Sequence, residues 1–147
     1  MQADNWLILV LIPILAWGSY GVIAKVLVNK DYLGIPTQTA GVLLIVGVML
    51  VFGIYFLLQP QQIPLNPIVI GIGLLAGIVW AVGQLFMFLA FESGLELSRL
   101  APLYNTNTLI AVLLGIILLK ELPAEGQTLK VVIGAVLIVI GAFLVSG

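Results

Sequence analysis

The sequence has no cysteine and no histidine among its 147 residues, and only 7% of them are charged. The absence of cysteine excludes a disulfide framework. It also excludes thiolate chemistry, and because histidine is absent too, the common Cys/His metal sites are excluded. The same absences remove the usual nucleophile and the usual general base of hydrolytic enzymes. We therefore predict that the chain is not an enzyme and uses neither a metal nor another cofactor.

Charged residues are too scarce for a soluble surface. A typical soluble domain has about 25% charged residues, whereas this chain has five Lys and Arg and six Asp and Glu. Hydrophobic residues make up 63% of it, and the mean hydropathy is +1.30. Five basic residues cannot build a basic patch for nucleic acid, and a disordered chain would be more polar. The composition predicts an integral membrane protein whose solvent is the lipid bilayer.

Five apolar stretches are long enough to cross a bilayer, which takes about 20 residues of helix. Residues 42–58 and 131–145 are apolar on all sides, which fits helices and not the alternating strands of a barrel. At the fourth stretch, Ser98 is a candidate N-cap and Pro102 is expected in the first turn. We predict an all-α polytopic membrane protein with residues 1–147 as a single domain. The expected helices are 6–28, 37–58, 67–91, 100–119 and 128–145.

Lysine and arginine are divided almost evenly between the two ends of these helices. Lys120 and Lys130 lie on one side of the membrane, and Lys25, Lys30 and Arg99 on the other. The positive-inside rule therefore gives nearly no bias. Two interpretations are open: a single orientation set by a small margin, or dual topology with copies pairing as an antiparallel homodimer. An odd number of helices favours the second, because many secondary transporters are built from inverted repeats.

Uncharged polar side chains lie deep in three of the expected helices. At 1.5 Å per residue, Tyr20, Gln84 and Asn105 should lie at similar depth. Polar residues inside a membrane are candidates for a functional site, but they also join helices, at about 0.6–2 kcal/mol each. Both interpretations are open for each residue. The candidate substrate-binding set, in which aromatic walls would surround amides that orient a neutral or zwitterionic solute, is Trp17, Tyr20, Trp80, Gln84, Tyr104, Asn105 and Thr108.

No carboxylate lies deep in an expected helix, because every Asp and Glu falls at a helix end or in a loop. Proton coupling through a buried acid needs such a group. The sequence therefore disfavours that mechanism, and it disfavours a strongly cationic cargo.

Residues 90–147 resemble the second half of an EamA-type domain of the drug/metabolite transporter superfamily. The resemblance lies in a polar turn, an early proline, a Glu-terminated apolar run and a glycine-centred last helix, here Glu92-Ser93-Gly94, Pro102, Lys120-Glu121, Gln127 and 134–141. The Trp17-Gly18 pair is similar as well. The resemblance implies an α-helical metabolite transporter, which we expect in the cell (plasma) membrane. Most relatives fuse two inverted halves, so it also implies an antiparallel homodimer or a related five-helix partner.

These observations predict a membrane transporter of small molecules that works by alternating access as a dimer of five-helix units. The alternative is a non-transporting integral membrane subunit that stabilises or positions a partner membrane protein. In that case the many glycines would serve close helix packing, and the polar residues would hold helices together.

Overall fold

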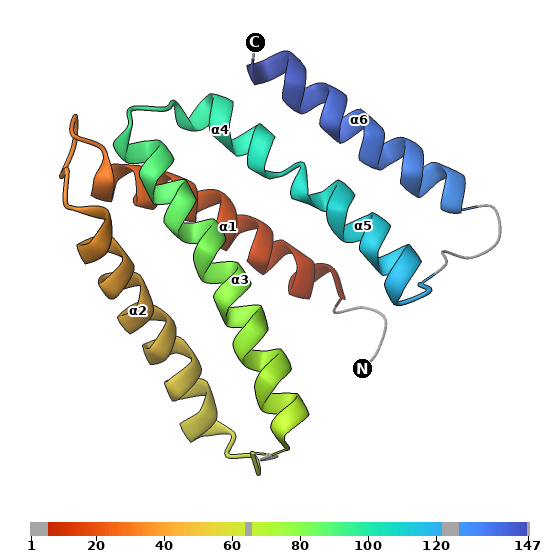
Figure 1. Cartoon of the computed structure of the whole chain (residues 1–147), viewed down its shortest axis with the longest axis horizontal. Coiled ribbons are helices and arrows are strands. Elements are labelled where there is room, and N and C mark those ends of the chain that lie inside the picture. Colours follow the sequence, from red (N-terminus) through yellow and green to blue (C-terminus); the bar gives the residue numbers. More distant parts are fainter. Residues whose placement is uncertain (1–5, 64–65, 122–126, 147) are drawn as a thin grey trace. The chain divides into compact units, whose positions relative to one another are not determined.

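The computed structural model describes residues 6–63, 66–121 and 127–146, and within them every regular element is a helix (Figure 1). Five segments are long and apolar enough to cross a membrane, the fourth of them interrupted. The prediction of an all-α protein with five membrane spans is therefore confirmed. The helices are α1 (Trp6–Val28), α2 (Thr37–Leu58), α3 (Pro67–Glu92), α4 (Leu97–Tyr104), α5 (Asn107–Leu118) and α6 (Thr128–Ser146).

The chain divides after Gly94 into two compact units. The N-terminal unit consists of α1, α2 and α3, which all contact one another. In the C-terminal unit, α6 packs along both α4 and α5. That residues 1–147 act as one domain stays a prediction.

The helices of the N-terminal unit have nearly the bounds expected from the sequence, and α3 shows why. Asn66 precedes the helix and its side-chain oxygen accepts a hydrogen bond from the backbone N–H of Ile68 at 2.9 Å. Pro67 occupies the first helical position, where its missing N–H costs nothing. An Asn-Pro pair before an apolar run is thus enough to locate the start of this helix.

The fourth membrane span differs from its prediction in where it begins. The helix starts at Leu97, because the Glu96 carbonyl already accepts hydrogen bonds from the backbone N–H groups of Arg99 and Leu100. Ser98 therefore does not cap the helix, and Pro102 lies in its interior and not in the first turn. An exposed ion pair at 3.5 Å between Arg99 Nε and a Glu96 carboxylate oxygen braces this turn.

The fourth span is also broken, at Asn105 and Thr106, where a continuous helix was expected. Pro102 has no N–H to donate, which removes one helical hydrogen bond just before the break. At the break, the backbone N–H of Thr106 donates to the Leu103 carbonyl, and that of Thr108 donates to the Asn105 carbonyl. Each bond reaches three residues back, whereas a regular α-helix bonds four residues back. The hydroxyls of both threonines donate to the same two carbonyls, at 2.6 and 2.8 Å. Such bonds compete with the regular helix.

Burial in the N-terminal unit is concentrated where α1 turns into α2. Ala24 and Ala40 are fully buried, and small side chains of this kind let two helices approach closely. Beyond Ala40, α2 has no further buried residue. The buried residues of this end are Gly21, Ala24, Val28, Asn29, Thr37, Ala40, Phe88 and Phe91.

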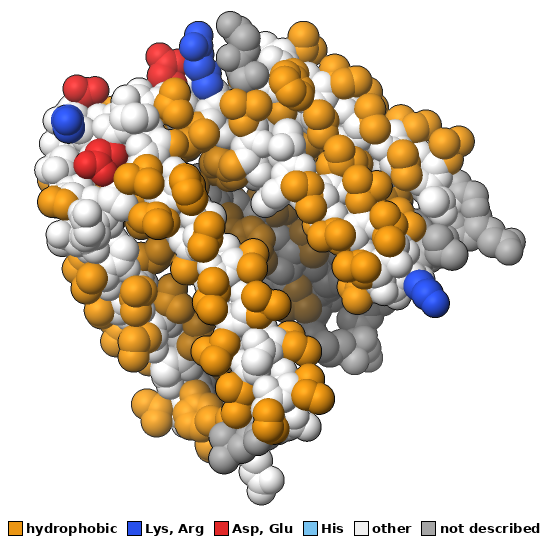
Figure 2. Space-filling model, in the orientation of Figure 1, with side chains coloured by type: hydrophobic (Ala, Val, Ile, Leu, Met, Phe, Trp, Pro, Cys, Tyr) orange, Lys and Arg blue, Asp and Glu red, His pale blue; other side chains and the backbone are white. Residues whose placement is uncertain are grey.

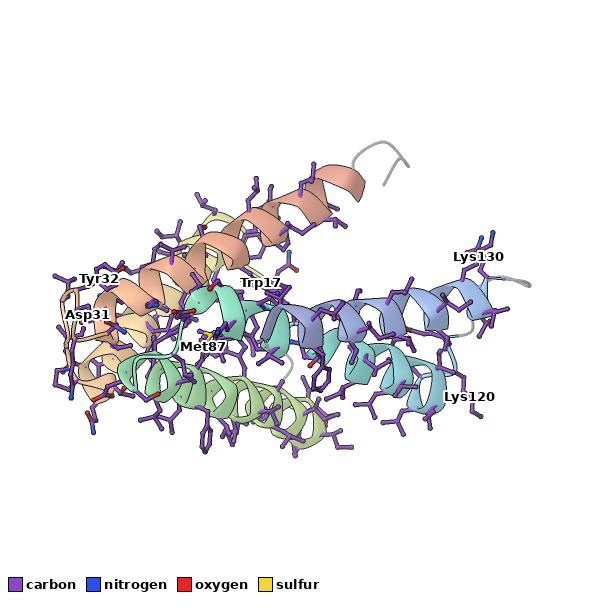
Figure 3. The ribbon with its side chains drawn as sticks, turned by 90° about the horizontal axis from the view of Figure 1, so that it is seen from above. Trp17, Asp31, Tyr32, Met87, Lys120 and Lys130 are labelled. Carbon is purple, nitrogen blue, oxygen red and sulfur yellow. The ribbon has the colours of Figure 1, made fainter. Side chains whose placement is uncertain are left out.

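Most of the remaining surface is apolar, as Figure 2 shows for one face. Leu57 and Leu144, for example, are 78% and 79% exposed. Charged side chains lie at helix ends. Figure 3 shows Asp31 at the turn after α1, Lys120 just past α5 and Lys130 in the first turn of α6. Water would penalise such an apolar surface by about 25 cal/mol per Å², whereas lipid does not.

Candidate functional site

A groove of about 580 Å³ lies between α1, α2 and α3, and all residues that line it belong to the N-terminal unit. Its volume falls within the range of about 300–1,000 Å³ that is usual for small-molecule sites. One wall is an apolar stripe along α2, spaced three and four residues apart so that its members share a helix face. The stripe consists of Ala40, Leu43, Leu44, Gly47, Val48 and Val51.

Four of the seven predicted site residues line this groove. Trp17 and Tyr20 come from α1, and Trp80 and Gln84 come from α3. Each pair is three or four residues apart, which places its members on one face of their helix. Figure 3 shows Trp17 in the middle of α1, well away from the turn that follows that helix. The structure thus brings these four side chains together, and their role in binding stays a prediction.

The hydroxyl of Tyr20 donates a hydrogen bond of 2.7 Å to Oε1 of Gln84. The two residues are 64 positions apart in the sequence, so the bond ties α1 to α3 at the groove. Both side chains are half-buried. By contrast, Trp17 is 72% exposed and Trp80 is 47% exposed. The tryptophan rings therefore keep free surface, while the tyrosine and the amide are held in place.

Polar contacts that sequence reasoning missed join the α1–α2 turn to the end of α3. Buried Asn29 donates from Nδ2 to the Phe91 carbonyl at 3.1 Å, and the hydroxyl of buried Thr37 donates to the Glu92 carboxylate. We call these two bonds, between the α1–α2 turn and the end of α3, the polar clasp. Asn29 directly follows the last apolar residue of α1, and that position is the signal that could have suggested it.

The other three predicted residues lie at the break of the C-terminal unit. Tyr104 ends α4, Asn105 lies in the break, and Thr108 is in the first turn of α5. Tyr104 and Thr108 are four residues apart, but the break between them interrupts the continuous helix that would place them on one face. Thr108 lines a smaller groove of about 320 Å³ together with Val112, Gly115, Glu121 and Val131.

Among the described residues, no group of three or more His, Cys, Asp or Glu side chains could hold a metal ion. The polar atoms of the larger groove instead belong to Trp, Tyr and Gln side chains. These groups can form hydrogen bonds and stack, but they carry no charge at neutral pH.

The five spans define a polytopic integral membrane protein, and a mostly apolar groove with a few polar groups is typical of small-molecule sites. The family model described as sugar transport protein matches residues 8–147. The chain therefore belongs to the sugar transport protein family. The prediction that the chain is not an enzyme is confirmed by this family, which together with the five spans indicates an integral protein of the plasma membrane.

The relatives are bacterial proteins with the name "Probable glucose uptake protein GlcU". That of Priestia megaterium is 28% identical over 141 residues, which cover 94% of this chain and 46% of the relative. That of a Bacillus cereus strain is 32% identical over 142 residues, with the same coverage. The chain thus spans about half the length of the curated relatives it matches. No solved structure matches the chain.

Proposed function

We propose that this chain is the sugar-binding unit of a membrane sugar transporter and that the groove between α1, α2 and α3 holds the sugar. The observation that carries the proposal is the groove itself, with Trp17 and Trp80 exposed beside the linked Tyr20 and Gln84. A sugar has apolar C–H faces, which aromatic rings cover well, and hydroxyls, which an amide can bind. The relatives' name makes D-glucose the first candidate.

The functional transporter, in this proposal, is a pair of five-helix units related by inversion and working by alternating access. The chain matches only 46% of its relatives' length, so a second unit of similar size would bring the pair to about that length. The nearly even division of Lys and Arg supports an inverted copy of this chain as the partner. A related five-helix chain is the other candidate. The resemblance to EamA-type domains agrees with this architecture, and that narrower assignment stays a prediction.

The alternative function, a non-transporting subunit beside a partner membrane protein, is favoured by one observation. The Tyr20–Gln84 hydrogen bond joins α1 to α3, as an interhelical bond in a purely structural bundle would. The two functions differ in what loss of Gln84 should damage: sugar binding in the first case and assembly in the second.

Proteoliposomes that contain the purified chain should take up D-glucose faster than L-glucose, by about tenfold or more, because a site that pairs with sugar hydroxyls rejects a mirror-image arrangement. Uptake of radiolabelled sugar measures this rate. Liposomes without protein give the background. Equal rates for the two sugars, or no uptake above background, would contradict the transport proposal.

A single cysteine added at either end of the chain should be labelled from both faces of the membrane, at about half of the copies from each. The readout is clean because the native chain has no cysteine. Membrane-impermeant maleimide, applied before and after permeabilisation, measures the fraction. In a control, three lysines added at the carboxyl end should shift the population to one orientation. Strictly one-sided labelling of the native sequence would eliminate the homodimer of inverted copies.

A further inference from the structure

Among the residues that the structure describes, Gln84 has the only side-chain amide that lines the larger groove. Its Oε1 already accepts one hydrogen bond, from the Tyr20 hydroxyl at 2.7 Å. No other described residue bonds to Gln84 through its side chain, so the Nε2 amino group keeps both N–H donors for a ligand.

The rest of the groove also offers hydrogen-bond donors but few acceptors. The indoles of Trp17 and Trp80 can only donate a hydrogen bond, through Nε1–H. The remaining walls are aliphatic or phenylalanine side chains. An amide N–H among such walls is energetically unfavourable until an oxygen accepts its hydrogen bond. The groove therefore offers its ligand mostly donors.

We infer that Tyr20 is a positioning residue that fixes the orientation of the Gln84 amide, so that the groove recognises a sugar through a hydroxyl oxygen that accepts a hydrogen bond. This inference rests on the proposed sugar-binding function and makes it more specific. A free amide can rotate by half a turn and present either its oxygen or its nitrogen. By donating to Oε1, the Tyr20 hydroxyl favours the orientation in which both Nε2 hydrogens are available to the ligand.

Monodeoxy and monodeoxyfluoro analogues of D-glucose test this assignment at each ring position. Fluorine can accept a weak hydrogen bond but cannot donate one, whereas the deoxy analogue can do neither. Affinities follow from quenching of tryptophan fluorescence, since Trp17 and Trp80 line the groove. For the native chain, we expect the fluoro analogue to bind about fivefold to tenfold more tightly than the deoxy analogue at one position, as one hydrogen bond implies.

Tyr20→Phe removes only the hydroxyl and should lower this ratio about twofold, because the released amide then presents its Nε2 donors in only about half of its orientations. The matched control is Tyr55→Phe on α2, which removes a hydroxyl outside the groove and should leave the ratio unchanged. A merely structural hydroxyl would change stability without changing the ratio. Thermal unfolding of both variants in detergent separates the two effects.

The outcomes are distinct. A ratio that persists in Tyr20→Phe overturns the positioning role. Equal loss for fluoro and deoxy analogues at every position of the native chain overturns the donor assignment, while D-glucose binding and the proposed function stand. If the native chain binds no D-glucose, the proposed function itself fails, and this inference fails with it.

Discussion

Replacing Gln84 with methionine should weaken D-glucose binding roughly 10- to 100-fold and reduce uptake by a similar factor. Methionine keeps the length and the flexible, unbranched shape of glutamine, so the walls of the groove persist. The ligand loses an amide donor and a sugar hydroxyl is left without its partner in an apolar groove, which is where the cost arises. Tryptophan fluorescence titration measures the affinity, and proteoliposome uptake measures transport.

Gln38→Met is the matched control for this experiment. Gln38 lies on α2 outside the groove and is exposed, so the same chemical change should alter neither binding nor uptake. Size-exclusion chromatography reports on assembly for both variants. If Gln84→Met binds sugar normally but no longer assembles, Gln84 only holds helices together, and the non-transporting subunit becomes the better account.

Replacing Asn29 with alanine should destabilise the N-terminal unit by about 2–4 kcal/mol. The Phe91 carbonyl and the backbone N–H of Asp31 would each lose a hydrogen-bond partner. Asn29 is 3% exposed, and its amide oxygen also accepts the backbone N–H of Asp31 at 2.9 Å. The substitution therefore breaks the bond to the Phe91 carbonyl and the local turn together. Thermal unfolding in detergent, followed by circular dichroism, measures the loss.

Asn66→Ala provides the comparison, because Asn66 also accepts a backbone N–H but is exposed. Loss of an exposed N-cap costs about 1 kcal/mol, so the shift in Tm should be clearly smaller than for Asn29→Ala. Equal shifts would show that the polar clasp contributes no more than an ordinary cap, and that burial at this end comes from apolar packing alone.

The positions of the spans could be predicted from the sequence because each is a long apolar run that ends at polar residues or proline. α1 and α2 begin and end at the expected residues for this reason. The break in the fourth span could not be predicted in the same way. The apolar pattern continues past it, and the cause is local: Pro102 withholds an N–H while the hydroxyls of Thr106 and Thr108 engage carbonyls.

The contact between Tyr20 and Gln84 was only partly accessible from the sequence. Rise per residue gave both side chains a similar depth, but depth does not determine which way a helix faces. Helices that are apolar on all sides have no polar stripe to indicate their rotation, so packing must settle it. Asn29 was not predicted for a different reason. An asparagine at the end of a helix is usually a solvated turn residue, and the sequence does not show that this one is buried.

The buried residues of α2 lie at its first turn, so this helix is held at one end only. The helix is anchored at Thr37 and Ala40 by the polar clasp and the small-residue contact, and its 22 residues extend about 33 Å. On such an arm, a rotation of about 5° at the anchor displaces the far end by about 3 Å, roughly the diameter of a water molecule. A small rotation at this anchor would therefore change the width of the groove at the far part of α2.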